Sequence, residues 1–334
     1  MFFSDLTEKS RYSGSVLLVV DNRSLFDASY GLADRSSGRP VRRDTQFQIA
    51  SVRKQFTAAA ILLLQEQGTL SVRDPLSKWI PDAPPEWTSI TLHHLLTHSA
   101  GVPHWGDIPQ LDLFHPVRWE AILAAFASRP LKFPPGNGYA YSSPGYHLLA
   151  KVVENATGDK YVDFLQRRIF IPLGMTRTAA GNRAADIEDI AMGYAGDQTA
   201  ASFDLDTTSM GAGDVWSTPG DLFRWNQALS QPGTILNGAS LAETFHPQVR
   251  IPEEEGPQTP GLTEVAYGYG WGLAKVGKVA VRYHDGRNSG YRSFNLWAPQ
   301  DRITLCVLSN QDTTDVLEIV LRVMERVPGL SSRD

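Results

Sequence analysis

The sequence predicts an α/β protein in which both ends of the chain contribute to one antiparallel sheet. Strand patterns occur close to the N-terminus, four more occur in the last quarter of the chain, and helical patterns occupy the segment between them. We therefore expect a discontinuous α/β domain made of residues 1–78 and 206–334. The inserted segment, residues 79–205, is expected to form a mainly helical domain.

The N-terminal part of the chain changes from strand to helix. The stretch "SGSVLLVVDNRSLFDASYGLAD" predicts two half-buried strands joined by a turn at Asp21 to Arg23. From Val52 to Gln67 an Ala- and Leu-rich pattern predicts a helix, and Gly68 stands where a glycine commonly ends one. The stretch "ITLHHLLTHSAGVP" predicts a short helix followed by a Gly/Pro loop.

Helices are expected through the middle of the chain and strands after it. Amphipathic patterns predict helices in "VRWEAILAAFAS", "GYHLLAKVVENAT" and "YVDFLQRRIFIPLGM", the last ending at Pro172. No strand is expected in this middle region, which extends to about Met210. A helix at "GDLFRWNQALS" precedes four strand-like runs, "YGYGWGLAKV", "VAVRYHDG", "YRSFNLWAPQ" and "RITLCVLSNQ". "DVLEIVLRVMERV" predicts a closing helix.

The amino-acid composition and net charge indicate which kinds of molecule the protein binds. The 334 residues are 42% hydrophobic and carry a formal net charge of -5, which argues against nucleic acid or an anionic membrane as a partner. A small molecule or short peptide is expected instead, and the oligomeric state is left open. The single cysteine, Cys306, lies in an apolar run and is expected to be buried. The first residues show neither a signal-peptide pattern nor a span, so the chain as given is expected to be cytoplasmic unless a leader was removed.

Ser51 and Lys54 are the first candidate catalytic residues. On a helix that starts near Ser51, positions i and i+3 share a face, so the amine of Lys54 can reach the serine hydroxyl. The N-terminus of a helix also favours developing negative charge. The same residues equally fit a helix-capping serine beside a surface lysine. The pair alone leaves both interpretations open, because an S-x-x-K match is expected by chance in a chain of this size.

Two later stretches carry further candidates. In "FPPGNGYAYSSPGYHLLA", Tyr141 precedes a turn into a helix, where its phenol can move a proton or simply pack against the loop. In "VRYHDGRNSGYRSF", Gly286 permits a close approach of the strand to the serine. The backbone N–H groups of Ser51 and Arg287 would then form an oxyanion hole.

In this order, "SVRK", "YSS" and "HDG" resemble the motifs of the serine β-lactamase and penicillin-binding-protein-like superfamily, in the branch of class C β-lactamases, D-aminopeptidases and family VIII esterases. "ITLHHLLTHSAGVP", "IPLGM", "GAGDVWSTPGDLFRW" and "YGYGWGL" extend the resemblance over most of the chain. The resemblance implies a five-stranded antiparallel sheet flanked by helices, an all-α lobe, and an active site at their interface. It implies that Ser51, Lys54 and Tyr141 are catalytic.

One position departs from the pattern of that branch, whose last motif is often H-x-G, and a second differs from the penicillin-recognising members of the superfamily. Ser143 stands where the family usually has the asparagine that holds the substrate's acyl amide, and its hydroxyl is shorter and lacks the amide's second donor. His284 stands where penicillin-recognising members have lysine, and a histidine, only partly charged near neutrality, is a weaker anchor for a carboxylate. We expect Ser143 and His284 to orient the substrate and tune proton transfer. Both differences favour simple esters or amides over β-lactams.

The resulting prediction is a serine hydrolase that acts through an acyl-enzyme, is of the carboxylesterase or D-aminopeptidase type, and needs no metal or other cofactor. The alternatives are a β-lactamase or D-alanyl-D-alanine carboxypeptidase and a non-catalytic ligand-binding relative. A zinc hydrolase is less favoured, because Leu95 and not Glu follows the first histidine of "HLLTH". An α/β-hydrolase is disfavoured because the chain has no G-x-S-x-G motif.

Overall fold

A computed structural model describes residues 12–182, 189–254 and 261–327. Its main element is an antiparallel sheet of eight strands in the order β10-β11-β12-β13-β14-β15-β1-β2. These strands are β1 (Gly14–Val20), β2 (Arg23–Tyr30), β10 (Val249–Arg250), β11 (Leu262–Tyr267), β12 (Gly272–Val276), β13 (Val279–Asn288), β14 (Tyr291–Ala298) and β15 (Ile303–Ser309).

The two ends of the chain meet in this sheet, as the sequence predicts. Strand β1 lies between β2 and β15, with Leu17 opposite Cys306 in the β1–β15 ladder. Asp21 and Asn22, which join β1 to β2, both have positive φ, as a tight hairpin turn of matching twist requires. Cys306 is free and fully buried, in agreement with its apolar surroundings in the sequence.

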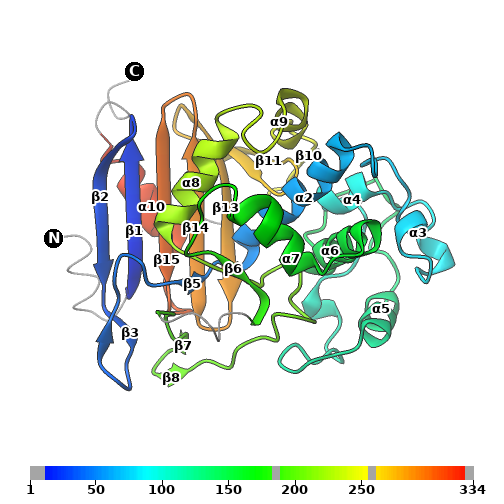
Figure 1. Cartoon of the computed structure of the whole chain (residues 1–334), viewed down its shortest axis with the longest axis horizontal. Helices are drawn as coiled ribbons and strands as arrows, with labels where there is room; N and C mark the ends of the chain where they lie inside the picture. The colour runs from blue at the N-terminus through cyan, green and yellow to red at the C-terminus, as the bar shows by residue number, and fades with distance from the viewer. Residues whose placement is uncertain (1–11, 183–188, 255–260, 328–334) are drawn as a thin grey trace.

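Helices cover both faces of the sheet. The helices of the described residues are η1 (Ala50–Arg53), α2 (Lys54–Glu66), α3 (Leu76–Trp79), η2 (Pro85–Trp87), α4 (Leu92–Leu96), η3 (Trp105–Asp107), α5 (Trp119–Ala127), α6 (Ser143–Thr157), α7 (Tyr161–Leu165), the π-helical turn η4 (Gln166–Phe170), α8 (Pro219–Leu229), α9 (Gly238–Thr244) and α10 (Val316–Met324). Helices α8 and α10 lie on opposite faces of the sheet, and α3 to α7 gather beyond α2 (Figure 1).

The alternation of side chains along β15 separates two cores. Leu305 and Val307 pack with Val320 of α10, whereas Cys306 and Leu308 belong to the larger core that includes α2 and α8. Because α2 contributes eleven buried residues, it forms the boundary on which the sheet and the helical part both pack. The segment that carries Ser51 and Lys54 is therefore held from both sides.

The short strands β5 (Phe47–Gln48), β6 (Ala179–Ala180) and β9 (Val215–Ser217) form a small sheet in the order β5-β9-β6. Two further pairs are β3 (Leu32–Asp34) with β4 (Arg39–Pro40) and β7 (Tyr194–Ala195) with β8 (Gln198–Thr199). The expectation of no strand in the middle region is therefore wrong, because β6, β7 and β8 lie there. Each of these three has only two residues, too few to show an alternating pattern.

The sheet has eight strands, where the resemblance implies five, although the fold class is the expected one. The strands of the large sheet fall within residues 1–78 and 206–334, and α4 to α7 fall within residues 79–205. We propose the same division into an α/β domain and a mainly helical domain.

Candidate active site

Ser51 lies at the start of the helical segment formed by η1 and α2. The residue before it, Ala50, has a positive φ of 47°, a backbone conformation that side chains rarely adopt and that is frequent at functional sites. The N–H of Ile49 donates to the carbonyl of Val215, and the carbonyl of Ile49 accepts from the hydroxyl of Ser293. The turn that presents Ser51 is thus fixed by β9 and β14.

The structure does not use Ser51 as a helix cap. Ile49 occupies the position before η1, and no side chain there bonds to the first turn. The Ser51 hydroxyl instead lies 2.9 Å from the Nζ of Lys54, one turn along the helix. The i, i+3 spacing therefore does bring the two groups together.

Lys54 is completely buried and has two more partners. Its Nζ lies 3.2 Å from the hydroxyl of Ser143 and 3.1 Å from the carbonyl oxygen of Ala212. Burial lowers the pKa of Lys54 well below its ordinary value, and the neighbouring cation Arg53 lowers it further, against the opposing effect of Asp285. A surface lysine, one of the two interpretations of the sequence, is excluded.

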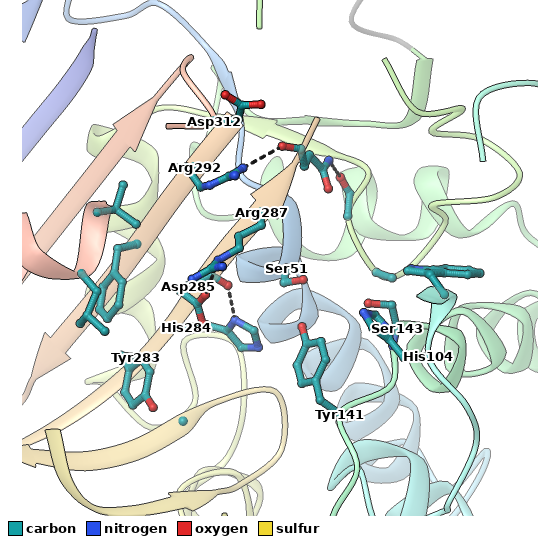
Figure 2. A pocket seen from close by; sticks show the side chains of 18 of the residues that line it. Ser51, His104, Tyr141, Ser143, Tyr283, His284, Asp285, Arg287, Arg292 and Asp312 are labelled. Atoms are coloured by element: carbon teal, nitrogen blue, oxygen red, sulfur yellow. Dashed lines mark hydrogen bonds and ion pairs between the residues drawn. The ribbon is translucent and has the colours of Figure 1, made fainter. Parts of the chain in front are cut away.

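Tyr141 approaches Ser51 from the helical side, and its phenol oxygen points toward the serine (Figure 2). The Lys54 Nζ lies 4.9 Å from the centre of the tyrosine ring. Burial raises the pKa of Tyr141 above its ordinary value, and hydrogen bonds to the hydroxyls of Ser51 and Ser143 offset only part of this effect. The phenol therefore stays protonated near neutral pH.

Strand β13 closes the other side of Ser51. Its pairing with β12 ends at Tyr283, so the last part of β13 has β14 on one edge and packs against η1 on the other. A Cβ atom at Gly286 would overlap the carbonyl of Ile49 and the hydroxyl of Ser293. The glycine is therefore what permits the strand to lie against the turn that carries Ser51, and Arg287 is the next residue along the strand.

His284 is held neutral, which corrects the expectation of a partly charged side chain. Its Nδ1 lies 2.6 Å from the carbonyl oxygen of Asp285 and its Nε2 lies 2.9 Å from the hydroxyl of Tyr267. Because the carbonyl only accepts, Nδ1 carries the proton and Nε2 accepts from the tyrosine. Burial is the main reason that the pKa of His284 is lowered to about 4. Both ring nitrogens are thus occupied.

A cleft of about 910 Å³ is lined by Ser51, Tyr141, Ser143, His284 and Arg287. Its neutral lining residues include His104, Trp105, Leu113, Tyr139 and Phe203. Its charged lining residues, Asp285, Arg287, Arg292, Asp312 and Asp315, belong to β13, β14 and the segment that leads into α10 (Figure 2). The cleft therefore combines neutral side chains with charged ones, and the charge of Asp285 acts on the Lys54 amine beside Ser51.

Sequence reasoning missed His104, Ala212 and Asp214. The Nδ1 of His104 accepts the N–H of Ser143, and burial is the main cause that lowers the pKa of His104 to about 4. Asp214 forms a fully buried ion pair with Arg53 and accepts the N–H of Gly211, which shapes the loop that offers the Ala212 carbonyl to Lys54. Ala212 and Asp214 lie in "GAGDVWSTPGDLFRW", a stretch that carries the family resemblance and could have pointed to them.

The histidines of "HHLLTH" have structural partners. His94 belongs to a capping box with Thr91, and the Nδ1 of His98 accepts the N–H of Ser142. In the three described ranges no three His, Cys, Asp or Glu side chains gather as a metal site would require. Among the helices of those same ranges, none is long and apolar enough to cross a membrane.

A family model and several known proteins are similar in sequence to this chain. The model of the family described as Beta-lactamase matches residues 2–324. Penicillin-binding protein 4* of Bacillus subtilis is 32% identical over 346 residues, which cover 97% of this chain and 74% of that protein. Esterase EstB of Burkholderia gladioli is 35% identical over 191 residues, which cover 52% of this chain and 48% of the esterase.

Two solved structures of similar proteins have the same fold as this chain. The D-amino acid amidase from Ochrobactrum anthropi SV3 superposes with a TM-score of 0.81 at 27% identity and covers 96% of this chain and 95% of the amidase. A penicillin-binding protein from Bacillus halodurans superposes with a TM-score of 0.79 at 28% identity, with 97% and 99% of the two chains covered.

Proposed function

Since this chain belongs to the beta-lactamase family and is a serine hydrolase, we propose that it hydrolyses a small ester or amide through an acyl-enzyme formed on Ser51. Lys54 is the base that takes the proton of the Ser51 hydroxyl. Tyr141 supplies a proton to the leaving group, and water then hydrolyses the acyl-enzyme.

The three partners of the Lys54 amine are the observation that carries this assignment. A neutral amine has two N–H donors and one lone pair. The carbonyl of Ala212 only accepts, and the hydroxyl of Ser143 can accept, so these two partners use both donors. The lone pair is left for the Ser51 hydroxyl at 2.9 Å, in the arrangement a general base needs.

The opposite pKa shifts of Lys54 and Tyr141 support a division of roles between them. A lysine whose pKa is lowered is available as a base, whereas a phenol whose pKa is raised remains a proton donor. Ser143 bonds to both groups, so it can pass the proton from the lysine ammonium back to the phenol. Each turnover thus returns both side chains to their starting states.

The backbone N–H groups of Ser51 and Arg287 would stabilise the oxyanion formed when the serine attacks. The close packing of β13 on η1, which Gly286 permits, supports this assignment. Preorganised backbone donors of this kind contribute on the order of 10² to 10³ in rate each.

The neutral state of His284 favours substrates without a carboxylate next to the reacting carbonyl. His284 has both ring nitrogens occupied and its pKa lowered to about 4, so it offers no positive charge to such a group. The partly exposed side chains of Trp105, Leu113 and Phe203 instead offer contact to an apolar substituent. Small uncharged esters and amides are therefore preferred over penicillins and cephalosporins, which carry a carboxylate.

The nucleophile is tested by intact-mass analysis after treatment with a fluorophosphonate. The wild-type chain is expected to gain one adduct and the Ser51→Ala variant none, because the serine hydroxyl is the attacking group. Ser36→Ala, which changes an exposed serine in a turn, serves as the control and should label as the wild type does. Equal labelling of the wild type and Ser51→Ala would remove Ser51 from this role.

Substrate preference is tested by comparing kcat/KM for p-nitrophenyl butyrate, a D-amino-acid p-nitroanilide and a chromogenic cephalosporin. The ester is expected to be turned over fastest and the cephalosporin slowest, because His284 is neutral and offers no positive charge to the cephalosporin carboxylate. If the cephalosporin were the best substrate, a β-lactamase would be the better assignment, with the exposed Arg287 as the group to examine for its carboxylate.

A further inference from the structure

His98, a buried residue just after α4, makes contacts with the segment that carries Tyr141. It is 2% exposed and has a positive φ of 58°. Such a backbone conformation is uncommon outside glycine and is kept only where the surroundings enforce it. The contacts of His98 account for this strained backbone conformation.

His98 holds the chain on both sides of Tyr141. Its carbonyl oxygen accepts the N–H of Ala140 at 2.9 Å, and its Nδ1 accepts the N–H of Ser142 at 3.1 Å. Its ring also packs on the ring of Tyr141, with 4.4 Å between the centres. One residue thus holds the residues before and after Tyr141 and packs on its ring.

The environment keeps the imidazole of His98 in one state. Because Nδ1 accepts a hydrogen bond, the proton resides on Nε2, which is buried with no hydrogen-bond partner and lies among the rings of Tyr146 and Tyr267. Burial, together with the nearby Lys54, His284 and His104, lowers the pKa of His98 well below its ordinary value. The acceptor on Nδ1 is therefore present throughout the neutral pH range.

We propose that His98 is a positioning residue for proton donation, holding the phenol of Tyr141 in the orientation that delivers its proton to the leaving group. This rests on the proposed role of Tyr141. His98 is too buried to meet the substrate, so it acts through the tyrosine alone. A small displacement of a catalytic group can cost about 10²-fold in rate. Removal of the His98 side chain is therefore expected to lower the rate strongly.

The test compares esters and amides that share one acyl group but differ in leaving group. p-Nitrophenolate departs without protonation, whereas an alkoxide or an amine requires a proton. His98→Gly removes the ring without straining a position of positive φ. It is expected to lower kcat about 10²-fold for the alkyl ester and the amide and less than about 5-fold for the p-nitrophenyl ester, with KM changed less than about 3-fold.

His98→Asn is the conservative variant. The Asn Oδ1 stands at the same number of bonds from the backbone as the His Nδ1, and asparagine tolerates positive φ. It should restore kcat for the alkyl ester to within about 10-fold of the wild type. If His98→Gly failed to fold, His98→Asn would still decide the question: a loss confined to the alkyl ester and the amide would support the proposal, and an equal loss for all leaving groups would overturn it.

Three comparisons separate the possible outcomes. His93→Ala changes a half-buried histidine of α4 with a tyrosine partner, Tyr269, and should leave the leaving-group dependence unchanged. Tyr141→Phe should reproduce the pattern of His98→Gly, and the double variant should lose little more. Equal losses for all leaving groups in His98→Gly would mean a structural role only. Absence of the pattern in Tyr141→Phe would instead contradict the proposed role of the tyrosine.

Discussion

Replacement of Lys54 by Met is expected to lower kcat by a factor of about 10² to 10⁴, because the variant keeps the buried side-chain volume and loses the base. Lys54→Arg should lose as much, since a guanidinium does not give up its proton. Steady-state kinetics with a p-nitrophenyl ester measure both effects. Lys78→Met, at an exposed position, is the matched control and should keep full activity. A Lys54→Met variant within about 10-fold of the wild type would contradict the assignment.

The pH profile of the wild type gives the same test without substitution. A base must be unprotonated, so kcat/KM should rise with pH through the pKa of Lys54, which lies well below its ordinary value of 10.5. With an alkyl ester, whose leaving group needs a proton, Tyr141 must remain protonated, so activity should persist until the pH exceeds the tyrosine's ordinary pKa of 10.0. A decline that begins well below that pH would rule out a protonated Tyr141 as the donor.

Replacement of Asp214 by Ala is expected to lower the free energy of unfolding by about 3–5 kcal/mol, because it leaves the guanidinium of Arg53 buried without its counter-charge. Urea denaturation measures this difference. Turnover should fall as well, since the loop held by Asp214 offers its Ala212 carbonyl to Lys54.

A surface pair and a double replacement serve as controls for this effect. Glu318→Ala removes a half-exposed partner of Arg322 on α10 and should change the free energy of unfolding by less than about 1 kcal/mol. Replacing Arg53 by Met together with Asp214 by Leu removes both charges and should recover much of the stability lost in Asp214→Ala. If Asp214→Ala cost no more than Glu318→Ala, the ion pair would not be a main support of the site.

The catalytic candidates that share a local pattern could be predicted from sequence. Ser51 and Lys54 lie one helical turn apart, and that geometry follows from their spacing alone. Contacts between distant segments could not be predicted in the same way. Nothing in the local pattern around Arg53 indicates that its partner is Asp214, or that the Nδ1 of His98 accepts the N–H of Ser142.

The charge of His284 and the size of the sheet were predicted less well for similar reasons. The protonation of a histidine depends on its burial and on partners such as Tyr267, which the residues next to it in sequence do not specify. Strand β10 has only two residues, and the pairing of β11 with β12 is interrupted by a register shift near Glu264, where φ is positive. Such short or irregular strands lack the alternation that marks a strand in sequence.

The burial of Lys54 also has a consequence for the stability of the whole chain. In the unfolded state this lysine takes up a proton below about pH 10.4, whereas in the folded state it does so only at its much lower pKa. Between these two values the unfolded state binds one more proton, so acidification across this window favours unfolding and a rise in pH favours the native state. The buried Lys54 thus lowers the stability of the folded protein at neutral pH. The Lys54→Met variant is expected to resist urea better than the wild type at that pH.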